Sequence, residues 1–152
     1  MTIERFLLDV PGVPVPKGRP RMTRGGIAYT PKATRDYERD LRILARDTMR
    51  GREPFSGPLT VEVCAYMPVP QSWPKWKTER VSDYGPALID HTSKPDLDNL
   101  AKTIDGLNGV VWVDDSQITD LHVYKRYSHQ PRLVVEVMHD ATAVHSKTKR
   151  KQ

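Results

Sequence analysis

The stretch LTVEVCAYM, residues 59–67, restricts the fold of this chain more than any other segment. Apolar and polar residues alternate along it, and prolines at positions 58 and 68 close it at both ends. Successive side chains of a β-strand point to opposite faces, so the pattern predicts a strand with Val61 and Val63 facing the core. The chain is therefore expected to contain a β-sheet with a buried face.

Further strands are expected wherever a short apolar run ends in turn residues. Such runs occur at residues 4–10, 110–113, 117–128 and 131–137, with a brief one at 87–91. The runs 117–128 and 131–137 follow each other closely, which predicts a hairpin around His129–Pro131.

A helix is expected between the strands 4–10 and 59–67, because apolar residues recur there at every fourth position. These residues are Tyr37, Leu41, Ala45 and Met49. Thr30 is the expected N-cap with Pro31 in the first helical position, and Thr34 is a later alternative cap.

A second helix is expected over residues 96–108, where apolar residues are spaced by three and four. They are Leu97, Leu100, Ile104 and Leu107. Asp98, Lys102 and Asp105 fall at i, i+4 and i+7, on the face largely opposite the leucines.

Two segments lack any helical or strand period. Residues 11–31 hold five prolines and four glycines and are expected to form an extended loop. Residues 68–86 form a long insertion with Trp73 and Trp76 and a short expected helix at 74–82. The two tryptophans suit either packing on the core or stacking on exposed nucleic-acid bases.

Helices and strands alternate only partly, which predicts an α+β fold: one domain with a mixed β-sheet and two main helices packed on it. The domain is expected at residues 1–138, followed by a basic, disordered tail at 139–152. The residues expected in the core by pattern are Leu41, Leu44, Val61, Val63, Val135 and Val137.

The composition favours a nucleic-acid partner and excludes several other classes. Lys and Arg number 24 against 19 Asp and Glu, a formal net charge of +5. Cys64 is the only cysteine, which excludes a disulfide framework or a cysteine-based zinc site. No apolar stretch approaches the ~20 residues needed to cross a bilayer, and the first residues lack the layout of a signal peptide. A cytoplasmic, reducing setting is expected.

Five aspartates lie in KPDLDNLAKTIDGLNGVVWVDDSQI, residues 94–118. Each has an ordinary structural explanation, since Asp96 can cap a helix, Asp98 can pair with Lys102, and the last two can form an acidic turn. Gathered in space, however, the carboxylates would repel each other unless a cation such as Mg²⁺ lay between them. Adjacent strand residues point to opposite faces, so only one of Asp114 and Asp115 can readily face a shared site.

The same residues resemble the signature of the RusA family of Holliday junction resolvases, which prophages commonly carry. The resemblance rests on KPDLDNLAK, DGLNG and DDSQI, and the upstream VPKGRPRMT and AYTPKATRDYE are similar to the N-terminal part of phage-type members. It spans roughly residues 10–138. Between the helix lysine and the next aspartate this chain reads Lys-Thr-Ile-Asp, one residue shorter than in many members, so the resemblance assigns no role to Asp105.

The resemblance implies a homodimer that cuts four-way DNA junctions by paired Mg²⁺-dependent incisions, in recombination and repair, inside a bacterial cell. Mn²⁺ is an alternative metal. It also implies that Asp96, Asp98 and Asp115 bind the metal and that Lys102 is the essential lysine, acting on the scissile phosphate. Asn99, Asp114 and Gln117 flank these residues and are expected to support them.

DNA contacts are expected from basic side chains outside the acidic segment: Lys17, Arg19, Arg21, Arg24, Lys125 and Arg126. The alternative for these residues is a solvated basic surface. Two other functions stay open: a non-catalytic nucleic-acid-binding protein, and a Mg²⁺-dependent nuclease for other branched DNA or structured RNA.

Overall fold

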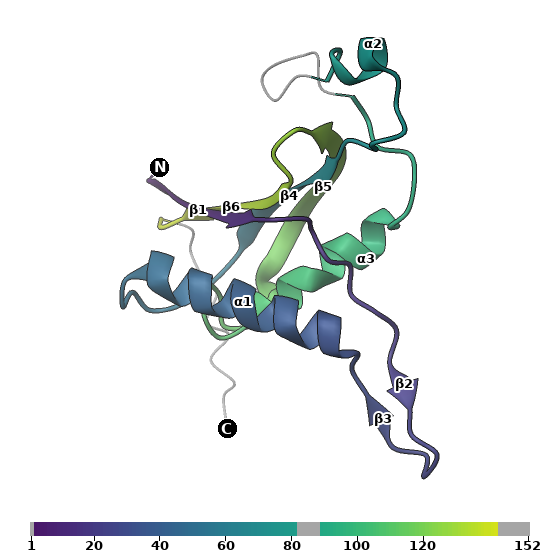
Figure 1. The fold of residues 1–152 in the computed structure, drawn as a ribbon. Helices are drawn as coiled ribbons and strands as arrows, with labels where there is room; N and C mark the ends of the chain where they lie inside the picture. The colour runs from purple at the N-terminus through teal and green to yellow at the C-terminus, as the bar shows by residue number, and fades with distance from the viewer. Residues whose placement is uncertain (1, 82–88, 143–152) are drawn as a thin grey trace, which may run out of the picture.

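The central sheet of the computed structural model, which describes residues 2–81 and 89–142, has four strands in the order β1-β6-β4-β5 (Figure 1). Their bounds are β1 (Ile3–Pro11), β6 (Arg132–Asp140), β4 (Leu59–Pro68) and β5 (Ile118–Ser128). β4 pairs with β5 in parallel, whereas β1 with β6 and β4 with β6 are antiparallel. The predicted α+β fold with a mixed sheet is thus confirmed, as are the strands predicted at these four places.

The predicted hairpin between β5 and β6 is wrong, because β4 lies between these two strands. β4 buries every second residue from Leu59 to Met67, and β6 buries Leu133, Val135 and Val137 opposite it. β5 is exposed at residues 119–122 and occupies the edge of the sheet. β4 and β6 have more complete apolar faces than β5, and these two strands pair with each other. The burial gained by their pairing outweighs the short connection, which would favour a hairpin of β5 and β6.

The run 110–113 is not the predicted strand but a turn whose first three apolar side chains enter the core, while Val113 is exposed. Val111 and Trp112 are both 0% exposed. The indole N–H of Trp112 donates to the side-chain carbonyl of Asn108, and Gly109 turns the chain at φ 79°. The backbone N–H of Phe55 donates to the carbonyl of Val111 at 2.8 Å, which attaches this turn to the segment before β4.

Helix α1 (Lys32–Met49) buries the predicted face, but neither threonine caps it. Its N-terminus has no side-chain cap. The hydroxyl oxygen of Thr34 instead accepts the backbone N–H of Gly18 at 2.8 Å, so it fixes the preceding loop to the helix. A Cβ at position 18 would lie 3.0 Å from the Pro31 side chain, so any other residue would have to push this close contact apart.

The helix predicted over 96–108 begins as α3 (Leu97–Ala101) and continues as a 3₁₀ helix, η2 (Lys102–Leu107). Leu100, Ile104 and Leu107 are buried as predicted, while Leu97 is 39% exposed. η2 packs closely on α1: a Cβ on Gly106 would lie 3.1 Å from the carbonyl oxygen of Glu38. This close contact places Asp105 beside α1.

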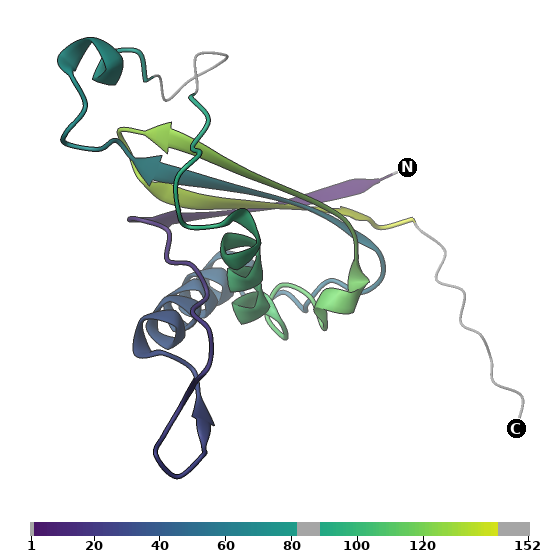
Figure 2. The ribbon, with the colours of Figure 1, turned by 90° about the vertical axis from the view of Figure 1, so that its right-hand side faces the viewer.

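Both helices lie on one side of the sheet, and no described helix covers the opposite face (Figures 1 and 2). The core between the helices and the sheet contains five of the six residues expected there, and Leu44 packs at its margin. The predicted loop 11–31 forms a small projecting hairpin of β2 (Arg21–Met22) and β3 (Ala28–Tyr29). No helix among the described residues is long and apolar enough to cross a membrane.

β6 continues through His139 and Asp140, two residues beyond the domain boundary expected at 138. The ring of His139 stacks on Phe55 at 5.2 Å between centroids, and its Nε2 lies 2.8 Å from the Ser56 carbonyl oxygen. The rest of the expected tail, residues 143–152, lies outside the described residues. So do residues 87 and 88 of the strand predicted at 87–91, of which Asp90 forms one bridge to Arg126.

Candidate active site

Asp105 and Asp115 are the two acidic side chains that the fold brings together. Asp105 belongs to η2, and Asp115 begins a short 3₁₀ helix, η3 (Asp115–Gln117), that leads into β5. Burial and the neighbouring carboxylates of Asp114 and Asp105 raise the pKa of Asp115. Both side chains line a hollow of about 270 Å³ together with Lys102 and apolar residues of η2 and β5.

Asp114 and Gln117 shape the turn that presents Asp115. The carboxylate of Asp114 accepts the backbone N–H of Ser116 at 3.3 Å. Hydrogen bonds from the Ser116 side chain and from this backbone N–H lower the pKa of Asp114. The side-chain oxygen of Gln117 accepts the backbone N–H groups of Val113 and Asp114 at 2.8 and 3.0 Å. Its amide nitrogen donates to the carbonyl oxygens of residues 55 and 57. Asp114 therefore faces its own turn and Asp115 faces the hollow.

Lys17 crosses from the loop 11–31 to this site. Its ammonium nitrogen lies 3.0 Å from Oδ2 of Asp105 and 3.3 Å from Oε1 of Glu38. Burial alone lowers the pKa of Lys17, but the bonds to the two carboxylates outweigh burial and raise it. Its backbone N–H donates to the carbonyl of Asn99 at 2.9 Å, so Lys17 attaches the loop to α3 as well.

Asp96, Asp98 and Lys102 lie along the start of the same helical segment. Asp96 occupies the N-cap position of α3, yet its carboxylate makes no capping bond, which leaves it free for another partner. Asp98 lies 3.7 Å from Lys102, and both side chains are more than half exposed. Lys102 also lines the hollow, so it stands between Asp98 and the pair formed by Asp105 and Asp115.

Within residues 2–81 and 89–142, no three His, Cys, Asp or Glu side chains stand close enough together to hold a metal ion. The chain thus does not gather Asp96, Asp98 and Asp115 as a set of three, and their metal role stays a prediction. The chemistry at the hollow nevertheless suits a hard divalent cation, because Mg²⁺ usually takes one or two carboxylates and completes its shell with water and phosphate oxygens. Asp115 supplies one such carboxylate, and Asp105, one oxygen of which is bonded by Lys17, lies beside it.

The predicted DNA-binding residues fall into two groups. Arg19, Arg21 and Arg24 are exposed on and around the β2–β3 hairpin. Lys125 and Arg126 instead hold the segment that leads to α3. The Lys125 ammonium donates to the carbonyl oxygens of Ser93 and Pro95 at 2.8 and 2.9 Å, and Arg126 forms a 3.0 Å ion pair with Asp90.

The two tryptophans of the insertion differ in environment. Trp73 packs edge-on against Tyr127 at 4.5 Å between ring centroids, with the Lys77 ammonium 3.9 Å from its own ring. Trp76, in the short helix α2 (Lys75–Thr78), is 60% exposed, with the Arg80 guanidinium 5.2 Å from its ring. The sequence does not distinguish them, because only the position of β5 shows which ring finds a partner.

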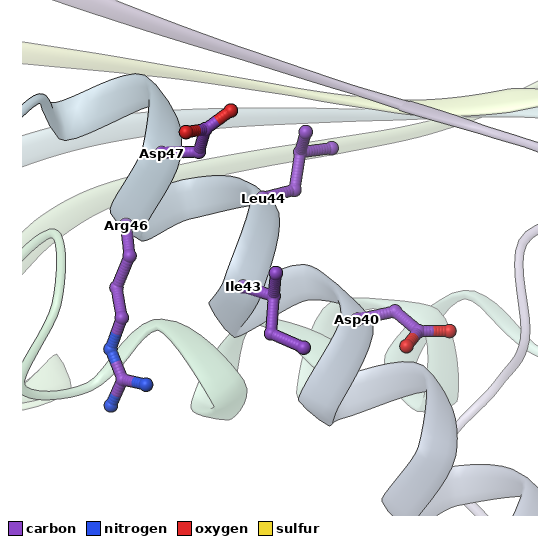
Figure 3. A pocket seen from close by; sticks show the side chains of 5 residues that line it. All are labelled: Asp40, Ile43, Leu44, Arg46 and Asp47. Carbon is purple, nitrogen blue, oxygen red and sulfur yellow. The ribbon is translucent and has the colours of Figure 1, made fainter.

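A larger hollow lies elsewhere, on the outer surface of α1, and offers no chemistry (Figure 3). Five residues of this single helix line it: Asp40, Ile43, Leu44, Arg46 and Asp47. No other element contributes a side chain, and both acids project from the helix into the open. The hollow beside η2 and β5 is therefore the better candidate for a reaction centre.

Sequence patterns missed the internal role of Lys17 and the contributions of Glu38 and Asp105. Lys17 and Asp105 are 88 positions apart, and no pattern in the sequence indicates contact between them. The only local signal is Gly18, whose lack of a side chain lets the loop approach α1.

Comparison with known proteins gives two matches. A family described as "Endodeoxyribonuclease RusA" matches residues 11–138. A protein of Bacillus subtilis (strain 168), "Uncharacterized protein YqaN", is 37% identical over 132 residues, which cover 84% of this chain and 89% of the relative. The matched range contains α1, α3, η2 and every acidic residue of the candidate site.

Proposed function

This chain belongs to the endodeoxyribonuclease RusA family, and on that premise we propose that it resolves four-way DNA junctions as a homodimer. The reaction is hydrolysis of one phosphodiester in each of two opposed strands, and it depends on Mg²⁺, with Mn²⁺ as an alternative. The setting is the cytoplasm of a bacterial cell, with a prophage as the source of the gene.

The observation that carries the proposal is the position of Lys102. Its ammonium pairs with Asp98 at 3.7 Å on one side, and on the other it lines the hollow with Asp105 and Asp115. A cation between carboxylates at an exposed surface is suited to receive a phosphate, because the lysine attracts the phosphate oxygens. In a protein with an excess of basic residues, this combination fits phosphodiester hydrolysis better than binding alone.

We propose that Asp96, Asp98 and Asp115 hold the divalent cation. When bound, it would lower the pKa of a water molecule and offset charge on the attacked phosphate. Two features of the chain support this assignment: the carboxylate of Asp96 is not used as a cap, and the pKa of Asp115 is raised, as expected for an acid placed where a positive charge is to bind.

Asp105 and Lys17 are proposed as positioning residues. One oxygen of Asp105 is bonded by Lys17, which limits its availability to a metal, and its charge acts on Asp115. Asp105→Asn is therefore expected to reduce cleavage by about tenfold, well short of the loss expected for a metal ligand. The measurement is the single-turnover rate at saturating and at limiting Mg²⁺, since a positioning residue alters the metal concentration needed for half-maximal rate.

The test of function is nicking of a synthetic four-way junction with and without Mg²⁺. Two symmetrical nicks are expected in the junction with Mg²⁺ and none without it. The Asp96→Asn and Asp98→Asn variants are expected to bind the junction normally and to lose cleavage by about a hundredfold or more. Cleavage by Asp98→Asn at the wild-type rate would remove this residue from the site.

A flap, a linear duplex and a structured RNA serve as the comparison substrates. Faster cleavage of any of them than of the junction would assign the same carboxylates to a different branched or structured substrate. Binding without nicking under all metal conditions would instead identify a non-catalytic nucleic-acid-binding protein.

The β2–β3 hairpin is proposed to hold DNA through Arg19, Arg21 and Arg24. Removing one arginine–phosphate interaction lowers the slope of log Kd against log salt concentration by about 1. Arg19→Ala and Arg21→Ala are expected to show this reduction in a filter-binding titration. Lys17→Gln is the matched control and is expected to keep the wild-type slope, because its ammonium is already bound by two carboxylates. Unchanged slopes in the arginine variants would contradict the proposal.

A further inference from the structure

The insertion after β4 presents one tryptophan to solvent and is anchored on both sides of it. Trp73 packs edge-on against Tyr127 of β5 at 4.5 Å between ring centroids, and the Lys77 ammonium lies 3.9 Å from the Trp73 ring. Val81, at the other end, is buried at 6% exposure. Trp76 stands between these anchors on α2, which buries none of its four residues, and Trp76 itself is 60% exposed. The exposed ring is therefore held in place from both sides.

The surroundings of Trp76 are basic rather than apolar. Residues 68–81 contain one acid, Glu79, and three cations: Lys75, Lys77 and Arg80. Lys75 lies 3.7 Å from Glu79, but its side chain is 89% exposed, and such a surface pair contributes little. Within this range Trp76 is the one large apolar side chain that is exposed. A protein-binding surface would add apolar area around its aromatic residue, whereas a lone ring among cations suits stacking on a base next to phosphates.

The described contacts leave one face of the Trp76 ring open. The Arg80 guanidinium lies 5.2 Å from the ring centroid and covers one face only. Within residues 2–81 and 89–142, no second aromatic ring stacks on Trp76. Every nucleobase has a flat π-face, so a base can stack on the open side of the indole while Arg80 supports the other side.

We propose that Trp76 stacks on a base of DNA whose face is open, with Lys75 beside it as a phosphate contact. The partner is single-stranded DNA or the branch point of a junction, where base faces are open, and not the interior of a duplex, where they are already stacked. Trp73 has the separate role of holding α2 on β5. Two tryptophans three residues apart therefore differ in role, one as an anchor and the other as the binding ring.

The position of α2 agrees with this role. In both views α2 lies on one side of the start of α3, and the β2–β3 hairpin lies on the other (Figures 1 and 2). The start of α3 carries Asp96 and Asp98, and the hairpin is proposed above to hold phosphates. DNA that lies across α3 would meet the cations of the hairpin and the open ring on α2. This step rests on the proposed function, whereas stacking of Trp76 on a base does not.

The first test is a double cycle between Trp76 and the bases, with the full chain and without metal. The ligands are a short oligothymidylate and a strand of the same length and charge with abasic sites in place of the thymidines. Wild type is expected to bind the oligothymidylate about tenfold more tightly than the abasic strand. Trp76→Ala is expected to bind both with equal affinity. A wild type without this preference, or a preference that survives in Trp76→Ala, would overturn the proposal.

Two further substitutions separate stacking from simple apolar contact. Trp76→Phe keeps an aromatic face and is expected to keep the preference for bases to within a few-fold. Trp76→Leu keeps apolar surface alone and is expected to lose the preference, as Trp76→Ala does. The matched control is Ile43→Ala, which removes an exposed apolar side chain from α1 and is expected to bind like wild type (Figure 3). All four variants are expected to keep the wild-type Tm, because both positions are exposed. Wild-type binding by Trp76→Leu would contradict stacking.

Salt dependence tests the phosphate contact separately. Lys75→Ala is expected to lower the slope of log Kd against log salt concentration for the oligothymidylate by about 0.7 and to keep the preference for bases. Trp76→Ala is expected to do the reverse. An unchanged slope in Lys75→Ala would remove this residue from the contact.

Comparison of DNA forms tests the requirement for open base faces. Trp76→Ala is expected to weaken binding of a four-way junction about as much as binding of the single strand, and to leave binding of a blunt duplex unchanged. Equal weakening on the duplex would refute the assignment. Because all binding is measured without Mg²⁺, the outcome is separate from that of the nicking assay: a chain that cleaves can lack stacking by Trp76, and a chain that does not cleave can show it.

Discussion

Asp115→Asn is expected to lower the rate of Mg²⁺-dependent junction cleavage about a thousandfold, equivalent to ~4 kcal/mol of transition-state stabilisation. The reason is that asparagine keeps the shape of the side chain but removes the negative charge that a divalent cation requires. The turn that presents this residue is held by Gln117 and Asp114, so the substitution leaves the surrounding structure in place. The measurement is the single-turnover rate on a four-way junction.

The same substitution is expected to leave the metal-free protein slightly more stable. The folded-state pKa of Asp115 lies above its ordinary value, so its ionised form opposes folding at every pH above the folded-state pKa. Removing the charge should increase the free energy of unfolding by ~0.5 kcal/mol at neutral pH, because the side chain is well exposed and screened. This gain should vanish as the pH falls below about 4, where both states are protonated.

Thermal unfolding with and without Mg²⁺ supplies a readout that does not depend on cleavage. The wild-type Tm is expected to rise with Mg²⁺, and the Tm of Asp115→Asn is expected to respond much less. Ser116→Ala, which changes the neighbouring residue but no charge, is the matched control and should retain both cleavage and the Mg²⁺ response. Wild-type cleavage by Asp115→Asn would eliminate the proposed site.

Trp112→Ala is expected to cause the largest loss of stability of any single substitution considered for this chain, about 3–5 kcal/mol. Trp112 is the largest of the fully buried side chains, at 0% exposure. Its removal leaves a cavity under the turn that leads to Asp115 and an unpaired side-chain carbonyl on Asn108. The chemical-denaturation midpoint should fall accordingly, and the Tm by roughly 10 °C.

Trp76→Ala is the matched control, because it removes the same ring from a position that is 60% exposed. It is expected to change the free energy of unfolding by less than ~0.5 kcal/mol. If both variants were equally stable, the packing of the turn around residue 112 would be contradicted. If only Trp76→Ala weakened junction binding, that result would indicate a base-stacking contact for the exposed ring.

Local patterns predicted the secondary structure wherever burial followed a simple period. The alternation in 59–67 and the four-residue period from Tyr37 to Met49 appear in the structure as β4 and α1. The strand predicted at 110–113 is absent because four apolar residues in succession suit a buried turn as well as a strand. Thr34 does not cap α1, because its hydroxyl oxygen accepts the backbone N–H of Gly18 instead.

In the candidate site, too, local patterns predicted some contacts and missed others. Asp98 with Lys102 could be predicted, since residues four apart on a helix are neighbours wherever the chain goes. The pairing of Asp105 with Asp115, and of Asp105 with Lys17, could not. Those contacts depend on β4 pairing with β5 and on Gly106 letting η2 approach α1.

The sequence by itself determined the family, the mixed α+β class, four strands of the sheet and the helical segment that carries Asp98 and Asp105, because each of these depends on residue types at short, regular spacings. Only the tertiary structure decided the strand order and the neighbours of Asp115. These depend on contacts between residues far apart in the chain, where many pairings are sterically open and total burial selects one of them.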